Sequence, residues 1–399
     1  MYTPSPKTLR SYAHVLTDFA LNGGSGIKRD EVVLVATQVA GLPLARQLYR
    51  AVLHRGGHPI LQLIDDECKR MLLAEGTAAQ VEFFPRAWMK GMAATIDHWV
   101  RVRAEDNPTY LKGIDPSRIM AAARSARPFR EWLDKKEDRG EFTWTLCLYG
   151  TEAAAAEAGM SIQEYWRQIR RACYLDTQEP IGRWQQTYKE MNRVLRALNR
   201  MPIDRLHLTA EGTDLWISVG NGRQWLGGRG RNIPSFEIFT SPDWRGTHGT
   251  ISFDLPLYRH GNIIKDITLR FEGGVVVEAS AGTNESLLRE MIRQRNADKV
   301  GEFSMTDRRF SRITRFMANT LYDENFGGRY GNTHIALGKA YHQALAGDRR
   351  SVSKKEYARM GFNESVEHCD IIASTPRTVT AHLAGGSRKI LYKNGVFVV

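Results

Sequence analysis

The residues best able to do chemistry are gathered between positions 300 and 341 of the 399-residue chain. Glu302 ends a short apolar run, Glu324 closes an acidic pair after a basic segment, and a loop with three glycines leads to His334. Tyr341 follows seven residues later, so on a helix the imidazole and the phenol would share one face. Carboxylates and a histidine gathered by a glycine-rich turn are typical of a metal site with oxygen and nitrogen ligands.

Three further polar candidates lie on either side of this stretch. Glu237 stands between Phe236 and Ile238 in the apolar segment NIPSFEIFTSPD. His368 and Asp370 are two residues apart in NESVEHCDIIAST, and on a strand such residues point to the same side. We therefore expect the last two side chains to face a common site.

Each candidate also has an ordinary structural interpretation. A single glutamate at a strand edge is commonly structural, His-x-Asp is often a surface pair, and His334 and Tyr341 could be a capping histidine and a core tyrosine. The metal hypothesis is favoured because several of these residues stand beside apolar sequence, where an unpaired charge is costly. Carboxylates and imidazoles without thiolates suit Zn²⁺, Co²⁺ or Mn²⁺.

Composition excludes several other classes of protein. A chain of 399 residues suits two domains, and 42% hydrophobic with 25% charged residues is ordinary for a globular protein. No apolar run reaches the roughly 20 residues of a membrane span, and the N-terminus has no secretion-signal core, so we expect a cytoplasmic protein without a membrane partner. The four cysteines have no CxxC spacing, which indicates neither a disulfide framework nor a thiolate zinc site.

The formal net charge of +12 raises the question of nucleic-acid binding. The 56 lysines and arginines are spread along the whole chain, usually beside acids, so no nucleic-acid partner is predicted. The densest cluster, DRRFSRITR at 307–315, is interpreted as the solvated face of a helix that buries Phe310, Ile313, Phe316 and Met317.

Residues 1–200 predict an α/β domain with a mainly parallel sheet. Short apolar runs at 31–37, 58–64, 78–85, 94–105 and 142–150 are expected to be strands, with a helix at 42–53 after the first. Alternation of strand and helix favours parallel pairing. No GxGxxG follows the first strand, so a dinucleotide site is not indicated.

Residues 201–399 predict a second, α+β domain that is mainly antiparallel and carries the chemistry. An amphipathic helix at 183–201 ends before Pro202, and beyond it apolar and polar residues alternate at 214–220, 250–258 and 267–282. Asn394-Gly395 predicts a hairpin at the C-terminus. That hairpin could finish the sheet of its own domain or contribute to an interface.

The chain resembles the aminopeptidase S/T family, the thermophilic-type dinuclear metalloaminopeptidases. The segments that carry the resemblance are AEDNP, NIPSFEIFTSP, VGEFS, YDEN followed by HIALGKAY, and NESVEHCD. The resemblance implies two divalent ions (Zn, Co, Mn or Mg), peptide substrates cleaved at their N-termini, and a homodimer with its catalytic domains facing an internal cavity. It implies metal ligation by Glu237, Glu302, His334, His368 and Asp370.

The same resemblance makes Tyr341 the active-site tyrosine and Glu324 a further ligand or base. A bound water would lose its proton to Glu302 or Glu324, and the Tyr341 hydroxyl would hydrogen-bond the developing oxyanion. One segment departs from the family pattern: GGRYGNT, before His334, is longer than expected.

A related class offers an alternative function. Enzymes that open the ring of 2,5-dihydroxypyridine with one non-haem iron are similar in sequence, and would use positions such as His334, His368 and Asp370. Retention of Glu237 and Glu302 favours a second metal ion and hydrolysis. The sequence therefore predicts a metal-dependent aminopeptidase, with the iron dioxygenase as the alternative.

Overall fold

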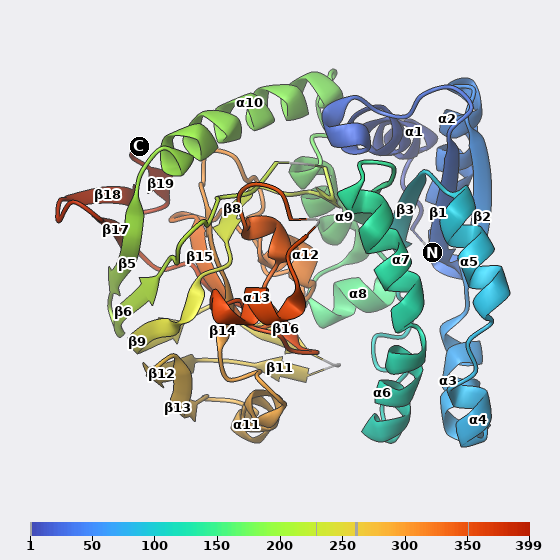
Figure 1. Cartoon of the computed structure of the whole chain (residues 1–399). Coiled ribbons are helices and arrows are strands. Elements are labelled where there is room, and N and C mark those ends of the chain that lie inside the picture. Colours follow the sequence, from blue (N-terminus) through green and yellow to red (C-terminus); the bar gives the residue numbers. More distant parts are fainter. Residues whose placement is uncertain (1, 229, 260–261, 350) are drawn as a thin grey trace. The chain divides into compact units, whose positions relative to one another are not determined.

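The computed structural model describes residues 2–228, 230–259, 262–349 and 351–399. The chain divides into two compact units: unit 1 contains Met1–Arg183 and Arg229–Ile233, and unit 2 contains Trp184–Gly228 and Pro234–Val399. Each unit has its own sheet system, shown with the element labels in Figure 1. No helix in the described part of the chain is both long and apolar enough to cross a membrane.

Unit 1 is built on a five-stranded parallel sheet in the order β2-β1-β3-β4-β7. Its strands are β1 (Val32–Gln38), β2 (His58–Ile64), β3 (His98–Arg103), β4 (Thr143–Leu148) and β7 (Asn232–Ile233). Its helices are α1 (Pro6–Val15), α2 (Leu42–His54), α3 (Asp66–Glu75), α4 (Ala78–Val81), α5 (Arg86–Thr95), α6 (Pro116–Ser125), α7 (Arg127–Asp138), α8 (Glu152–Glu157) and α9 (Ile162–Ala172). The predicted α/β class with a mainly parallel sheet is confirmed.

Helices cover both faces of this sheet at its strand β1. Leu34 of β1 packs with Ala93 of α5 and with Phe129 and Leu133 of α7, and all four are buried. Successive side chains of a strand point to opposite faces, so the neighbours of Leu34 in β1 face the other layer, where α2 contacts both β1 and β2. The nearly continuous apolar sequence of β1 reflects this two-sided burial.

One predicted strand of unit 1 is wrong. Residues 78–85 contain the short helix α4 instead. Thr77 and Gln80 form a reciprocal capping box, in which each side chain accepts a hydrogen bond from the backbone N–H of the other residue. These two bonds satisfy donors that a helix start leaves unpaired, and they override the apolar run that suggested a strand.

The long helix α10 (Pro180–Asn199), predicted at 183–201, leads into the eight-stranded antiparallel sheet of unit 2. That sheet has the order β13-β12-β9-β6-β5-β17-β18-β19. Its strands are β5 (Ile203–Ala210), β6 (Thr213–Ser218), β9 (Asp243–Phe253), β12 (Ile267–Glu272), β13 (Val275–Ser280), β17 (Thr378–Leu383), β18 (Arg388–Lys393) and β19 (Val396–Phe397). The predicted antiparallel character is confirmed.

A second sheet of unit 2 has four antiparallel strands in the order β16-β15-β14-β8. They are β8 (Glu237–Thr240), β14 (Val300–Thr306), β15 (Asn332–Gly338) and β16 (His368–Ala373). The pair β10 (Leu257–Arg259) and β11 (Asn262–Ile264) and the helices α11 (Glu285–Arg293), α12 (Thr320–Asp323) and α13 (Lys354–Arg359) complete the unit. Pro256 separates β9 from β10, so residues 250–258 are not one strand.

The helix predicted over 307–315 is wrong: the described residues between β14 and α12 contain none. The buried Asp307 carboxylate accepts hydrogen bonds from the backbone N–H groups of Arg309 and Phe397, and so fixes the chain in an irregular path. Phe310, Ile313 and Met317 are buried as expected, whereas Phe316 is only partly buried. Their burial comes from the loop's packing and not from a helical face.

The C-terminal hairpin completes the sheet of its own unit. β18 pairs with β17 and β19 with β18, and the turn at Asn394 and Gly395 has φ of 49° and 86°. Tyr392 and Phe397 are buried, and the Tyr392 hydroxyl donates to the carbonyl of Thr306 at 2.8 Å. The hairpin turn predicted at Asn394-Gly395 is therefore present, and Leu391, Tyr392 and Phe397 are buried while Ile390 and Val398 are exposed.

Candidate metal centre

Strand register places five of the candidate side chains on one face of the four-stranded sheet. Residues directly opposite each other on antiparallel strands point to the same face. Glu302 of β14 is opposite Ala336 of β15, which is opposite Asp370 of β16. In the same way, Ser304 is opposite His334, Thr306 is opposite Glu237, and Gly338 is opposite His368. Period-two alternation joins these rows into a single face.

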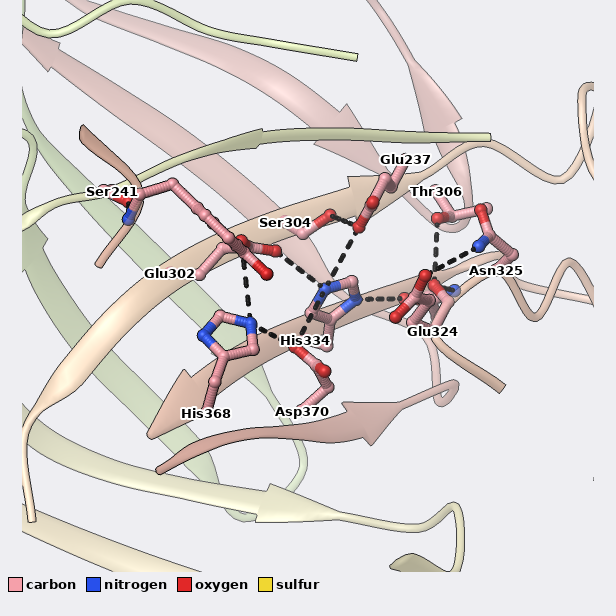
Figure 2. A network of polar contacts seen from close by, with 12 residues as sticks. Glu237, Ser241, Glu302, Ser304, Thr306, Glu324, Asn325, His334, His368 and Asp370 are labelled. Atoms are coloured by element: carbon pink, nitrogen blue, oxygen red, sulfur yellow. Dashed lines mark hydrogen bonds and ion pairs between the residues drawn. The ribbon is translucent and has the colours of Figure 1, made fainter. Parts of the chain in front are cut away.

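The side chains on this face point toward one another, as Figure 2 shows. The His334 Nε2 atom lies 3.5 Å from Glu237 Oε2, 3.3 Å from Glu302 Oε1 and 3.9 Å from Asp370 Oδ1. The His368 Nε2 atom lies 3.4 Å from Asp370 Oδ1 and 4.0 Å from Glu302 Oε2. Apart from His368, which is partly exposed, these residues are buried.

The cluster contains two sets of three potential ligands that share one residue. Glu237, Glu302 and His334 form the first set, and Glu302, His368 and Asp370 form the second. Within each set, one ligand atom from every residue lies within 4.8 Å of the others. The Glu302 carboxylate directs Oε1 toward His334 and Oε2 toward His368. The sequence predicted all five residues, but only the structure shows that Glu302 belongs to both sets.

Glu324 lies beside the cluster but belongs to neither set. It directly follows α12 and is buried, and the Asn325 side-chain amide donates to its Oε1 at 3.3 Å. Burial raises its pKa well above the ordinary value, and the negative charges of Glu237 and Asp370 raise it further. Its carboxyl group is therefore close enough to interact electrostatically with the charged groups of the cluster.

Tyr341 reaches the cluster by a route that the sequence did not predict. His334 is on strand β15, which ends at Gly338, so the expected two-turn helix from His334 to Tyr341 is absent. The Tyr341 backbone N–H donates to Ser241 Oγ at 2.8 Å, and its ring centroid lies 4.8 Å from that of His368. The residue is 37% exposed, so its phenol stands at the border between the cluster and solvent.

Two backbone or amide oxygens orient the histidines. Nδ1 of His334 lies 3.3 Å from Asn332 Oδ1, and Nδ1 of His368 lies 2.8 Å from the carbonyl of Lys339. Since these oxygens can only accept a hydrogen bond, Nδ1 of each ring carries the hydrogen, and a neutral imidazole would then keep its Nε2 lone pair for a metal ion.

Asn332 connects two parts of the site and was missed by the sequence analysis. Its side-chain amide also donates to the carbonyls of Glu324 and Phe326, at 3.0 and 2.7 Å. Its place two residues before His334 is the available signal, because on a strand it must share the face of that histidine. Asn325, also missed, accepts the Phe236 N–H next to Glu237 at 2.5 Å.

The pKa values show the electrostatic cost of the cluster without a cation. Burial raises the pKa of Glu302 to about 7, because the His334 hydrogen bond only partly offsets burial and the Glu237 charge. Burial lowers the pKa of His368, but the Asp370 charge and hydrogen bond outweigh it and raise the pKa to about 9. Hydrogen bonds to Glu237 and Glu302 likewise raise the pKa of His334 well above normal against the effect of burial.

The residues present fit divalent cations. In the described part of the chain, the ion pairs of Glu237, Glu302 and Asp370 are made with the two histidines alone, although three buried carboxylates attract strong positive charge. Buried carboxylates at this spacing are costly unless a cation offsets them. Oxygen and imidazole donors in sets of three are the ligands that divalent metal ions take.

The fold and this donor set define a metal-dependent enzyme, and the comparisons with known proteins give its family. The family model of the thermophilic metalloproteases (M29) matches residues 5–397, so the chain belongs to that family. Aminopeptidase T of Thermus aquaticus is 28% identical over 410 residues, covering 96% of this chain and 98% of that protein. Aminopeptidase AmpS of Bacillus subtilis is 26% identical over 414 residues, covering 97% of each.

The solved structure of AmpT from Thermus thermophilus has the same fold. It superposes with a TM-score of 0.83 at 24% identity and covers 98% of this chain and 99% of its own. The predicted family and the predicted fold class are thereby confirmed, and the alternative iron dioxygenase has no support in these comparisons.

Proposed function

We propose that this metal-dependent peptidase is an aminopeptidase whose site holds two divalent ions, with Glu302 as the ligand that would serve both. The single observation that carries the proposal is the sharing of Glu302 between two sets of three ligands. The class of metal-dependent aminopeptidase follows from family membership and from relatives named as aminopeptidases.

Charge balance supports two ions over one. Glu237, Glu302, Glu324 and Asp370 would together carry four negative charges when ionised, and two divalent ions would carry four positive charges. A single ion would leave two buried carboxylates without compensation, at a cost of several kcal/mol each on the order given for buried unpaired charges. Burial raises the pKa values of Glu302 and Glu324, and the charges of neighbouring carboxylates raise them further.

The donor types limit the choice of metal. Cys369 lies between His368 and Asp370 on β16, and the alternation of the strand turns its thiol away from the cluster. Burial raises the pKa of Cys369 to about 12, so it stays a neutral thiol at physiological pH. Carboxylate and imidazole ligands without thiolate favour Zn²⁺, Co²⁺, Mn²⁺ or Mg²⁺.

The protein's own groups divide the work of hydrolysis between them. Bound divalent ions would supply Lewis-acid polarisation and a water that is acidic enough to react near neutral pH. Glu324 would take the proton of that water and pass it to the leaving amine, because it lies beside the cluster and is not needed in either ligand set. Glu302 would serve as a ligand, which narrows the two roles that the sequence left open for it.

Tyr341 would donate a hydrogen bond to the oxyanion that develops on the substrate. Burial and the charges of Glu302 and Asp370 raise its pKa well above the ordinary value, so the hydroxyl keeps its proton at neutral pH. Its position at the solvent border of the cluster suits a group that meets substrate. A donor aimed at developing charge lowers the barrier without strengthening ground-state binding.

Peptides with a free N-terminus would be the substrates. Their free α-amine would bind a metal ion or an acidic side chain of the site, which restricts cleavage to the first residue. A homodimer and a cytoplasmic location are further proposals that rest on the resemblance of the sequence to the family.

Metal titration of the metal-free protein tests this proposal. Protein stripped of metal should be inactive, and Co²⁺, Zn²⁺, Mn²⁺ or Mg²⁺ should restore hydrolysis of aminoacyl-amides as two ions per chain are taken up. An N-acetylated aminoacyl-amide with the same side chain is the matched control and should not be cleaved. Full activity with one ion per chain would overturn the dinuclear site, and equal cleavage of the acetylated substrate would overturn the aminopeptidase.

A further inference from the structure

One aromatic side chain lies on the metal-binding face of the four-stranded sheet but belongs to neither ligand set. Phe239 stands on β8 two residues after Glu237, so by alternation it points to the same face as that carboxylate. It is opposite Ser304 of β14, which is in turn opposite His334 of β15. Phe239 therefore borders the set that contains Glu237 and His334, on its β8 side.

Phe239 is the apolar strand residue of this face that solvent can reach. The face carries two other apolar residues on its four strands, Ala336 and Ile372, and they are only 0% and 3% exposed. Phe239 is partly buried, and the short side chain of Ser304 separates it from His334. An apolar group that enters the site would therefore meet Phe239 and not another strand residue.

The ring of Phe239 is held in place before any substrate arrives. The Phe239 N–H donates to the carbonyl of Leu226 at 2.9 Å, and the Leu226 N–H donates to the carbonyl of Phe239 at 2.8 Å. A wall that is already ordered loses little conformational entropy when a ligand binds to it. The side chain packs against a buried apolar cluster, which contains Leu226, Ala340, Ala344, Leu345, Tyr357 and Phe362.

Phe239 and Tyr341 form the two sides of an aromatic corner next to the metal centre. Their ring centroids are 5.9 Å apart and their planes are inclined by 62°. Tyr341 in turn contacts His368, with 4.8 Å between the ring centroids. The Cα atom of a substrate's first residue carries its amine, its reacting carbonyl and its side chain. With the amine at the metal centre and the carbonyl at Tyr341, the side chain is left to face the Phe239 side of the corner.

We propose that Phe239 is the specificity-determining residue of the site, which contacts the side chain of the substrate's first residue and selects large apolar side chains there. This role rests on the proposed function, because that function places the amine and the carbonyl of the first residue. A leucine side chain would lose contact with water against the ring, and this contributes a factor of about 10 to 150 in affinity when burial is complete. An asparagine side chain has nearly the same shape, but its amide would lose hydrogen bonds to water.

Binding of free amino acids, the products of cleavage, tests this contact without turnover. Calorimetry on the Co²⁺-loaded protein should show that L-leucine binds about 10- to 150-fold more tightly than glycine. L-Asparagine should bind with an affinity close to that of glycine. This comparison of two side chains of one shape uses the wild type alone.

Two variants of similar size assign the preference to Phe239. Phe239→Gln places a polar group against the substrate side chain and should lower the ratio of leucine to glycine affinity about 10-fold. Phe239→Leu keeps an apolar contact and should retain most of the ratio. Glycine affinity and metal content should stay unchanged in both, because Phe239 belongs to neither ligand set.

Met360→Ala is the matched control for the packing of Phe239. Met360 packs against the same apolar cluster but lies on none of the four strands of the sheet. Its truncation should lower the melting temperature and leave the ratio of leucine to glycine affinity unchanged. The ratio of kcat/KM for leucinamide and glycinamide should follow the binding ratio in the wild type and in all three variants.

The outcomes separate this role from the proposed function. Equal affinity of the wild type for leucine and asparagine overturns the role of Phe239, and so does a preference that Phe239→Gln leaves intact. Cleavage of leucinamide and glycinamide at one rate overturns it as well, while the aminopeptidase stands. Selective leucine binding that depends on Phe239, in a protein that cleaves no aminoacyl-amide, overturns the proposed function and leaves the contact in place.

Discussion

The five-stranded sheet of unit 1 and the four-stranded sheet of unit 2 both bury their central strands, but they bury opposite chemistry. In β1 the buried side chains are apolar, and removing them from water stabilises the fold by roughly 25 cal/mol per Å². In β14 and β15 the buried side chains include Glu302 and His334. Burying those groups costs free energy unless a cation offsets the charge. The first sheet serves stability, and the second gives up stability for a binding site.

The largest effect expected from this comparison is on Glu302. Glu302→Gln keeps the volume of the side chain but removes the charge shared by both ligand sets, so metal content should fall toward zero. The loss in kcat should exceed the roughly 10³-fold upper cost of deleting one oxyanion donor. Asp370→Ala, which belongs to one set, should remove a single ion. Metal analysis and activity on the same samples would measure both effects.

The stability of the metal-free protein should rise with the substitution that lowers its metal content. The melting temperature of metal-free Glu302→Gln should rise by a few degrees, because one buried and repelled carboxylate is gone. Leu34→Ala in β1 is the contrasting change and should cost about 2–5 kcal/mol of stability while metal content per folded chain is unchanged. If metal-free Glu302→Gln were less stable than the wild type, the buried Glu302 carboxylate would not cost the four-stranded sheet any stability.

Tyr341→Phe should have the next largest effect and should separate catalysis from metal binding. Loss of the hydroxyl should lower kcat about 10²- to 10³-fold with little change in KM, because the hydrogen bond belongs to the transition state. The ring and its contact with His368 remain, so metal content should equal that of the wild type. Full turnover would show that Tyr341 only packs, and loss of metal would show that it supports a ligand.

Asn332→Ala should have a smaller effect that acts through His334. Removing the acceptor at Nδ1 should weaken metal affinity about 10- to 100-fold, as for other residues that orient a ligand. Asn363→Ala is the matched control: Asn363 is also buried and donates to two backbone carbonyls, but no hydrogen bond among the described residues joins it to the cluster. Calorimetric metal binding should distinguish the two variants, and equal affinities would remove Asn332 from the site.

The smallest expected effect is the pH dependence of the metal-free protein. Folding raises the pKa of Glu302 from 4.5 to about 7, so its stabilising contribution is complete below pH 4.5 and is lost as the pH rises through 7. The His368 contribution is complete below its unfolded value of 6.5 and is lost as the pH rises through about 9. The melting temperature should therefore fall across this range, and thermal melts would record it.

Bound metal should reverse this trend, because ligands must lose protons to bind and metal affinity rises with pH. Glu302→Gln should lessen the fall between about pH 5 and 7 without abolishing it. Asp323 contributes to the remainder, since burial raises its pKa to about 7 despite hydrogen bonds from the Met317 and Asn319 N–H groups. A metal-free protein that gained stability toward alkaline pH would contradict the assigned repulsion.

Local signals in the sequence determined much of the fold. The apolar run at 31–37, the amphipathic segment at 183–201 and the Asn394-Gly395 turn became β1, α10 and the terminal hairpin. The spacing of apolar residues and the residues of the turn specify these elements locally, so the tertiary structure contains them as predicted. Strand alternation by itself was also enough to predict that His368 and Asp370 share one face.

Other features depended on contacts between residues far apart in the chain, which periodicity cannot supply. The loop at 307–315 is not helical because Asp307 binds the backbone of Phe397, 90 residues away. Strand β15 ends at Gly338, which pairs with His368 of β16. Tyr341 therefore lies beyond a strand, and its side chain does not have the orientation that a helix from His334 would have given it.

Only the strand register revealed that Glu302 serves two ligand sets and that Phe239 borders one of them. The sequence by itself determined which residues could bind metal. The tertiary structure decided how they are shared, because a site is defined by distances between strands, and those distances come from pairing across the whole unit.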